Sequence, residues 1–186
     1  RDDVKIIGDY MEEEATEAAA MATMEDWATS YGRIDCILTT ADLLGNGAYE
    51  AVKDDDTYDG MLVYSVDCLA KTVLEIKDGV YTAAVYQNPP ALAAANLKAA
   101  YDLLTGAETV VNTSVDSLLC TSDNVDQFIQ MYIDQGQITE DEAKSHGYEA
   151  GSTTSILDEQ SDDSESEKTT EEATDDSTEE AEKEAE

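Results

Sequence analysis

Short β-branched runs alternate with helix-length segments along most of the chain, and this alternation constrains the fold more than any other feature. Each run rich in Val, Ile, Leu or Tyr is followed by a segment of helical periodicity and by Gly, Pro or Asp turn residues. Strands that alternate with helices are typical of α/β folds with mostly parallel sheets. We therefore predict a three-layer α-β-α fold. The predicted strands cover residues 4–7, 34–38, 61–65, 80–86 and 115–120.

Capping residues mark the ends of the predicted helices. A helix is expected over residues 13–31 and ends at Gly32. Pro89 and Pro90 suit the first turn of another helix that stops at Gly106. Further helices are expected after Ser122 or Asp123, and at Thr139, which opens a capping box. The apolar residues at helical spacing in the first helix are Ala20, Met24, Trp27 and Tyr31.

Acidic residues dominate the charge of the chain. Its 186 residues include 44 acidic and 10 basic ones, for a net charge of −34. Residues 151–186 hold 15 acidic residues and two lysines, and apart from alanine they contain no apolar residue after Leu157. We predict a disordered acidic tail there and a folded region over residues 1–150. The charge argues against nucleic acid and anionic membranes as partners, and no apolar run approaches the ~18 residues of a membrane span.

The sequence offers little that could carry out catalysis or hold a metal. His146 is the only histidine, and no nucleophile–base pair can be built around it. The loop at 55–60 begins like a calcium loop but has Val66 at its twelfth position. Three cysteines are too few and too far apart for a disulfide scaffold or a zinc site, and Cys36 is expected to be a small buried residue. We therefore expect no catalytic residue, no metal and no cofactor.

Polar residues follow the predicted strands where their carboxyl ends should meet. Thr40, Asp67 and Gln87 each follow a different strand, and α/β proteins bind ligands at this edge of the sheet. The edge has carboxylates and amides but no Lys, Arg or His, which favours a neutral, hydroxyl-rich ligand. Tyr10 or Tyr86 could supply an apolar face for a sugar ring.

Two of the carboxylates at this edge have a second interpretation. Asp42 and Asp67 both stand at expected helix starts, the first of a helix to residue 53 and the second of a helix to residue 76. A side chain that accepts from the first turn of a helix would explain either residue without a ligand. Capping and ligand binding therefore both stay open for these two residues.

Four stretches, in order along the chain, resemble the type I periplasmic sugar-binding proteins. Residues 34–52 resemble the family's strand that ends in Asn-Asp, with the following helix. Residues 63–67 resemble its next strand, which ends in a ligand-binding Asp. Residues 76–89 resemble its segment of Gly, then Ala-Thr-Val, then Gln-x-Pro, and residues 122–126 resemble a common ending near the carboxyl terminus. The resemblance spans about residues 4–135.

The resemblance implies a solute-binding component of a sugar ABC importer, with a sugar-like small molecule and an ABC permease as partners. It implies two α/β lobes that close on the ligand at a hinge, with Asp67 and Gln87 bonded to sugar hydroxyls. The family's ligand-contacting Asn falls on Ala41 here, a departure that removes a donor and an acceptor and that Thr40 could compensate. Glu14 falls near a position that often contacts ligand.

The resemblance also implies that the chain is the later portion of a longer protein. Residues 1–150 would form a partial binding-protein region, with residues 88–114 crossing to the other lobe. The protein would be extracellular or periplasmic, held by a lipid anchor at its missing amino terminus, with no membrane insertion in this portion. The alternative is the ligand-sensing domain of a lac-repressor-type transcription regulator, which shares the fold; the net charge of −34 favours the exported protein.

Overall fold

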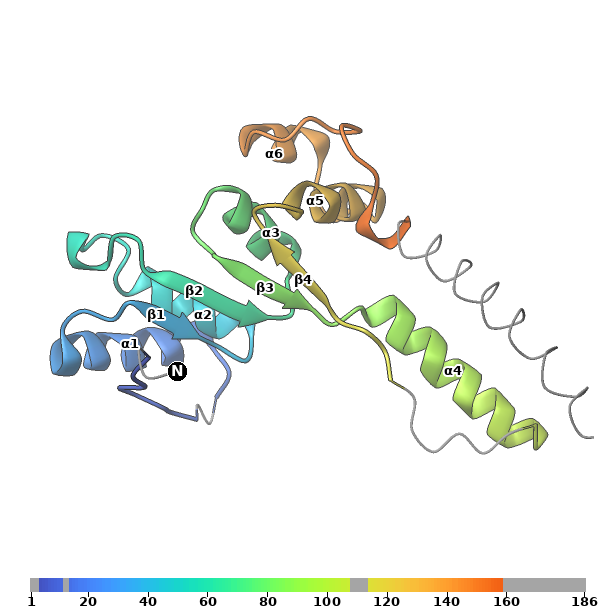
Figure 1. Cartoon of the computed structure of the whole chain (residues 1–186), viewed down its shortest axis with the longest axis horizontal. Coiled ribbons are helices and arrows are strands. Elements are labelled where there is room, and N and C mark those ends of the chain that lie inside the picture. Colours follow the sequence, from blue (N-terminus) through green and yellow to red (C-terminus); the bar gives the residue numbers. More distant parts are fainter. Residues whose placement is uncertain (1–3, 12–13, 108–113, 159–186) are drawn as a thin grey trace, which may run out of the picture. The chain divides into compact units, whose positions relative to one another are not determined.

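A computed structural model describes residues 4–11, 14–107 and 114–158 (Figure 1). The chain divides into two compact units, Arg1–Val125 and Asp126–Glu186. The first unit contains a four-stranded sheet of order β1-β2-β3-β4, in which β1, β2 and β3 are parallel and β4 is antiparallel to β3. This confirms the predicted α/β class with a mostly parallel sheet. The strands are β1 (Cys36–Leu38), β2 (Leu62–Val66), β3 (Ala83–Tyr86) and β4 (Leu118–Thr121).

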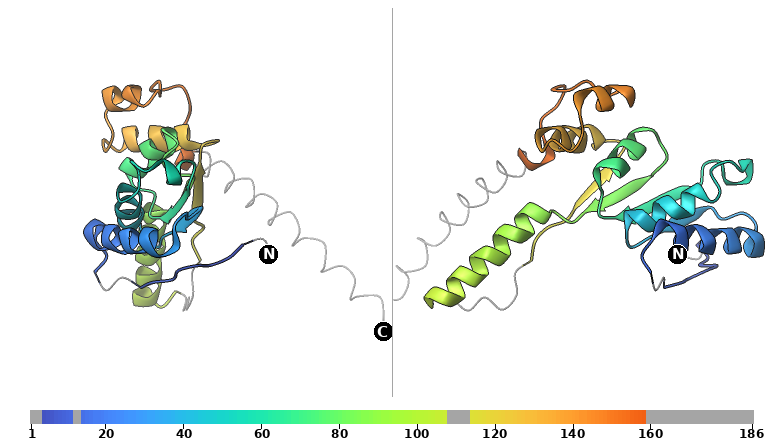
Figure 2. Two further views of the ribbon diagram at one scale, coloured as in Figure 1. Left: turned by 90° about the vertical axis from the view of Figure 1, so that its left-hand side faces the viewer. Right: turned by 180° about the vertical axis from the view of Figure 1, so that it is seen from behind.

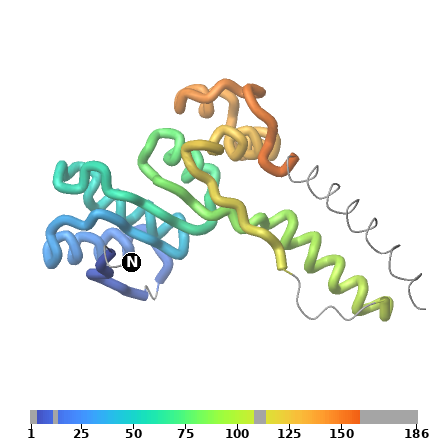
Figure 3. Tube along the Cα trace, in the orientation of Figure 1, coloured from blue at the N-terminus to red at the C-terminus, as the bar shows by residue number. Residues whose placement is uncertain are grey.

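Helices connect the strands of the first unit and cover one face of the sheet. α2 contacts β2, α3 contacts β3, and α1 packs on α2; Figure 2 shows these three helices on the same side of the sheet. Figure 3 follows the chain from β3 into α4 and shows β4 beside β3. The helices are α1 (Glu17–Tyr31), α2 (Asp42–Glu50), η1 (Asp56–Tyr58), α3 (Ala70–Lys77) and α4 (Pro89–Thr105).

Strand alternation separates a buried face of the sheet from a more exposed one. On the face toward the helices the side chains are fully buried, whereas Leu38, Leu62 and Leu119 on the other face are exposed. The register places these two sets at alternate positions of the same strands. The core of the first unit therefore lies between the sheet and its helices. Its strand residues are Ile37, Val63, Ser65, Ala84 and Cys120.

In the part of the second unit that the structure describes, two labelled helices and their connections form the packing core. α5 (Val125–Asp134) begins at the last residue of the first unit, and α6 (Glu140–Ser145) follows. Thr139 accepts a hydrogen bond from the Glu142 amide at 3.2 Å and caps α6, as predicted. Tyr148 is buried and its hydroxyl donates to Gln130 at 2.8 Å. The fully or nearly fully buried apolar residues here are Phe128, Ile129, Met131, Ala143 and Tyr148.

Two expectations for the amino-terminal half are wrong. Residues 4–7 form no strand, and Val4 and Ile6 are 65% and 82% exposed. A β-branched run becomes a strand only when another strand takes up its backbone hydrogen bonds, and none of the described strands pairs with this run. Cys36 is exposed rather than buried, because it shares the open sheet face with Leu38.

Helix ends agree with the sequence at some positions and shift at others. α1 starts at Glu17, later than expected, because Thr16 caps it by accepting from the Ala19 amide at 3.2 Å. The expected ends at Gly32 and Gly106 are confirmed, with φ values of 68° and 69° that favour glycine. Of the predicted disordered tail at 151–186, residues 151–158 are described, with Ser155 only 6% exposed, and residues 159–186 lie outside the described residues. Among the described helices, none has both the length and the apolar character that a bilayer crossing requires.

Candidate ligand-binding site

Asp67 and Gln87 meet at the carboxyl edge of the sheet. Gln87 Nε2 donates to Asp67 Oδ1 at 2.7 Å. Asp67 directly follows β2 and Gln87 directly follows β3, and these strands are parallel neighbours. Gln87 is exposed and Asp67 half-buried. The two side chains that the sequence places after separate strands therefore form one exposed polar pair.

The backbone around this pair takes conformations that are rare outside glycine. Asp67 has φ 108° and Cys68 has φ 56°, and the Asp67 amide still donates to Val85 at 3.0 Å. Asn88, next to Gln87, has φ 53° and caps α4 by accepting from the Ala91 amide at 3.4 Å. Asp and Asn tolerate this region better than other side chains. Both connections thus leave their strands by sharp turns that hold Asp67 and Gln87 at the edge.

Asp42 forms hydrogen bonds on both sides of the loop that contains Asp67. It is fully buried, and its carboxylate accepts from the Ser65 hydroxyl at 2.5 Å and from the Leu69 amide at 2.6 Å. Leu69 is the N-cap residue of α3, so Asp42 bonds to the start of the next helix rather than capping its own. These bonds tie the end of β2 to the start of α3, and Asp67 lies between these two points.

The structure excludes the capping interpretation for both aspartates. Asp42 is the first residue of α2, and its N-cap Ala41 forms no side-chain cap bond. Asp67 stands two residues before the N-cap of α3 and bonds to Gln87 instead. The expected caps are therefore wrong for both helices, and only Asp67 lies at the exposed edge.

A second buried network joins α1, α2 and the residue Tyr81. The Tyr81 hydroxyl donates to Asn46 Oδ1 at 2.9 Å and also lies 3.1 Å from the Asp42 carbonyl. Asn46 Nδ2 donates to Glu17 Oε1 at 3.4 Å. Burial, with nearby carboxylates, raises the pKa of Tyr81, which keeps its hydroxyl a donor. Asn46 and Tyr81 were not singled out from the sequence, because nothing local marks a polar residue whose partner lies 35 positions away.

The remaining expected site residues are placed with fewer contacts. Thr40 is exposed and Ala41 half-buried in the turn from β1 to α2, at the same edge as Asp67. Glu14 is exposed before α1, and its carbonyl accepts from the Thr16 amide at 2.8 Å. Among the described residues, no hydrogen bond or ion pair joins Glu14 to the Asp67–Gln87 pair.

The two candidate tyrosines differ in accessibility. Tyr86 is only 4% exposed, so its ring is not available as a face for a ligand in this structure. Tyr10 is 59% exposed and lies in the segment before α1. Of the two, only Tyr10 keeps an accessible ring.

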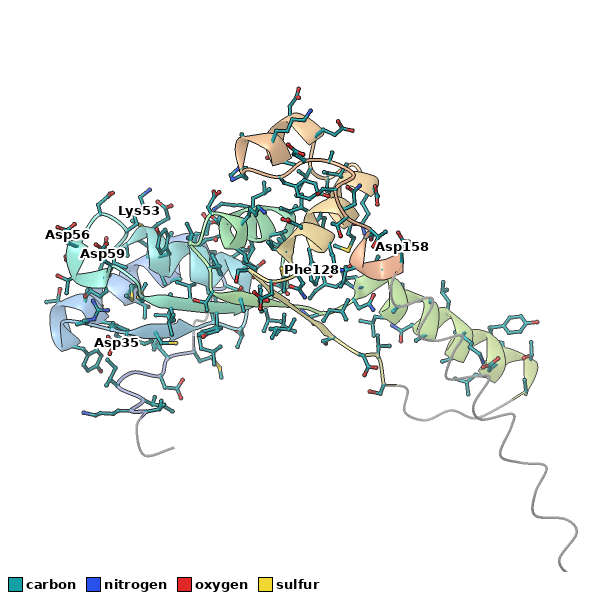
Figure 4. The ribbon with its side chains drawn as sticks, turned by 45° about the horizontal axis from the view of Figure 1, so that its top comes forward. Asp35, Lys53, Asp56, Asp59, Phe128 and Asp158 are labelled. Carbon is teal, nitrogen blue, oxygen red and sulfur yellow. The ribbon has the colours of Figure 1, made fainter. Side chains whose placement is uncertain are left out.

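The calcium-like loop lies away from this edge. Asp35 precedes β1, while Asp56 and Asp59 precede β2, so all three lie where the strands begin (Figure 4). Asp55 accepts from the Thr57 amide at 2.9 Å and caps η1. Within the described ranges, no group of three His, Cys, Asp or Glu residues is arranged to hold a metal ion.

Comparison with known proteins relates this geometry to one family. The family model described as periplasmic binding protein domain matches residues 1–108. No curated protein matches the chain. Many solved structures do match the chain.

Three solved structures illustrate the match. A myo-inositol binding protein from Caulobacter, bound to myo-inositol, is 27% identical with a TM-score of 0.53, and the match covers 59% of this chain and 38% of that one. An ABC transporter solute binding protein from Bacillus halodurans with bound myo-inositol is 24% identical with a TM-score of 0.56, over 62% and 40%. A third, from Clostridium phytofermentans with bound β-D-glucose, is 21% identical with a TM-score of 0.55, over 69% and 44%. The chain thus spans less than half the length of these proteins.

Proposed function

The chain belongs to the periplasmic binding protein domain family, and from that premise we propose that it is part of an extracytoplasmic solute-binding protein. In this proposal it binds a sugar or sugar-like neutral ligand and delivers it to an ABC permease, without chemical change. The observation that carries the proposal is the Asp67–Gln87 pair, joined at 2.7 Å at the carboxyl ends of two parallel strands. The pair lies at the edge of the sheet where α/β proteins bind their ligands.

The chemistry of the pair suits hydroxyl groups. A carboxylate accepts hydrogen bonds and an amide both donates and accepts, so together they complement a ligand hydroxyl that does both. In the proposal Asp67 Oδ2 accepts from a ligand hydroxyl, while Oδ1 stays bonded to Gln87. A charged acceptor makes such a bond stronger than one between neutral groups.

The ligand class is supported by the similar structures. The Caulobacter protein is bound to myo-inositol, and the Clostridium phytofermentans protein to β-D-glucose. Both molecules are neutral and carry hydroxyl groups around a ring. Ala41 stands where the family has a ligand-contacting Asn, and its side chain has no polar atom. In this proposal the Thr40 hydroxyl makes the hydrogen bonds to ligand that the Asn makes in the family.

Hinge closure is the proposed mechanism, with residues 88–114 crossing to a second lobe. Gln87 lies between β3 and the N-cap of α4, and β4 returns beside β3. α4 exposes Leu97, Tyr101 and Leu104, at 73%, 67% and 88%, and a lobe packed against them would bury this apolar surface. A ligand that contacts both lobes stabilises the closed state by its differential affinity for it.

Calorimetric titration of the full-length protein tests the proposal. The panel contains myo-inositol, D-glucose, D-allose and L-arabinose, with an anionic sugar phosphate as comparison. We expect binding of at least one neutral polyol, and a loss of about 10- to 100-fold in affinity for Asp67→Asn, which replaces the charged acceptor of a ligand hydroxyl, and for Gln87→Ala, which removes an amide.

Asp123→Asn is the matched control. Asp123 is exposed and follows β4, whose carboxyl end lies at the opposite edge because this strand is antiparallel. The Asp123→Asn substitution removes the same charge as Asp67→Asn and should leave the affinity for ligand unchanged. Absence of binding across the neutral panel, or an Asp67→Asn variant with normal affinity, contradicts the proposal.

A further inference from the structure

Two of the three cysteines are buried against one another. Cys68 and Cys120 are both 0% exposed, and a hydrogen bond joins their side chains. This bond, with burial next, raises the pKa of Cys68, so the Cys68 thiol stays neutral. Cys36, in contrast, is exposed on the open face of β1. Nothing in the Asp67–Gln87 site accounts for two adjoining thiols.

The sheet register explains how residues so far apart in the chain meet. Ser65 pairs with Ala84, and Ala84 pairs with Cys120, so the three lie in a row across β2, β3 and β4. Residues in such a row point to the same face of the sheet. For these three it is the buried face, where Ser65 is 3% and Ala84 1% exposed.

The loop after β2 brings Cys68 back under the same face. Its positive φ of 56° follows that of Asp67 and reverses the direction of the chain. Leu69 donates its amide to Asp42, the same carboxylate that accepts from Ser65 on the buried face. Because Ser65 and Leu69 share one carboxylate, Cys68 is held beneath the sheet beside Cys120.

We propose that Cys68 and Cys120 form an intramolecular disulfide under oxidising conditions, which ties the loop that carries Asp67 to β4. Two thiols within hydrogen-bonding distance on a rigid framework need little movement to form the bond. The cross-link would enclose residues 69–119, which include all of β3 and α4. It would hold the Asp67 loop in place.

The oxidant in the proposed step is a small-molecule disulfide such as oxidised glutathione. One cysteine thiolate attacks the reagent, its S–S bond breaks, and one reagent thiol leaves, which gives a mixed disulfide. The second cysteine thiolate attacks the protein sulfur of that mixed disulfide and expels the other reagent thiol. The two cysteines are oxidised, the reagent is reduced, and the two cysteine protons end on the two reagent thiols.

Refolding under defined redox conditions tests the proposal. A Cys36→Ser variant of the full chain is unfolded, so that the buried thiols become accessible, and refolded with oxidised and reduced glutathione or with reductant alone. We expect the oxidised sample to lose the mass of two hydrogen atoms and to yield one cross-linked peptide pair containing Cys68 and Cys120. Its thermal midpoint should rise by at least about 5 °C, because the cross-link constrains the unfolded chain, and reductant should reverse the rise.

The matched control adds Cys68→Ser and Cys120→Ser to the same background. It should show no redox-dependent shift in thermal midpoint. Peptide mapping of the natural chain, with Cys36 present, gives a measurement that does not depend on how the variants fold. Free thiols at both positions after oxidative refolding, or a linkage of either one to Cys36, overturn the proposal.

Discussion

Buried carboxylates of the first unit differ in how well their surroundings satisfy them. Asp42 has a partner for each oxygen, the Ser65 hydroxyl and the Leu69 amide. Glu75 Oε1 lies 3.3 Å from Lys71 Nζ, but Glu75 Oε2 is buried with no hydrogen-bond partner among the described residues. A buried oxygen without a hydrogen bond lowers the stability of the fold. We therefore expect the Glu75 carboxylate to be destabilising, in contrast to that of Asp42.

Glu75→Gln should raise the free energy of unfolding at pH 7. Burial raises the pKa of the Glu75 carboxyl, partly opposed by Lys71, so the folded pKa lies above the unfolded one. Wild-type stability is therefore lost as pH rises through the folded pKa, and Gln does not ionise. The advantage of Gln should shrink as pH falls toward the ordinary carboxyl pKa of about 4.3. Urea unfolding across pH measures this.

A control for that series is Glu149→Gln, which removes the same charge at an exposed position. It should change the free energy of unfolding at pH 7 by no more than about 0.5 kcal/mol. If the gain in stability from Glu75→Gln grows on acidification, the pKa of Glu75 is not raised by folding.

Helix contacts in the first unit depend on glycine at close approaches. A Cβ at Gly47 in α2 would lie 2.1 Å from the Glu17 carbonyl oxygen of α1, and a Cβ at Gly45 would lie 2.4 Å from the Tyr81 hydroxyl. Both glycines have ordinary helical backbone, so space and not conformation requires them. The Gly-Asn-Gly run in α2 is therefore a packing surface for α1 and Tyr81.

Gly47→Ala should lower the free energy of unfolding by about 1–3 kcal/mol. The added methyl group meets backbone, which cannot turn aside as a side chain can, so α1 and α2 must separate. This cost exceeds the ~1 kcal/mol that alanine gains over glycine in helix propensity. Urea denaturation measures the change.

Glu50→Ala provides the comparison on the exposed side of the same helix. It removes only a surface ion pair with Lys53 and should cost no more than about 0.5 kcal/mol. A Gly47→Ala variant as stable as the natural chain would argue against close packing of α1 on α2.

At the scale of the whole molecule, net charge of one sign opposes folding. With 44 acidic and 10 basic residues, most carboxylates lack a cationic partner in the sequence. Such an excess keeps a protein soluble but destabilises compact states by self-repulsion. The ion pairs among the described residues are mostly local pairs along single helices, such as Lys98 with Asp102 at 2.5 Å. They do little to offset the excess of negative charge.

Salt should therefore stabilise this chain. Raising the NaCl concentration from about 0.01 M to about 0.15 M shortens the Debye length from ~30 Å to ~8 Å and weakens the repulsion. We expect the thermal midpoint, measured by circular dichroism, to rise by a few degrees, and KCl to act equally well. A midpoint that falls with salt would contradict this account.

Local sequence patterns correctly predicted the alternation of helices and strands after the first helix, the mostly parallel sheet and several element ends. Periodicity and turn residues are local, so Gly32, Gly106, Pro89 and Thr139 could be assigned without knowing any partner. The resemblance along residues 4–135 also identified Asp67 and Gln87, which the structure brings within 2.7 Å of each other.

Which polar and sulfur atoms meet depends on how the elements pack in three dimensions. Residues 4–7 form no strand although their composition suits one, because strand formation requires a partner. Asp42 bonds to the next helix, Cys36 is exposed and Cys68 lies against Cys120, because sheet register and loop turns set these relations. Contacts between distant residues depend on how the elements pack, and local sequence patterns do not predict this packing.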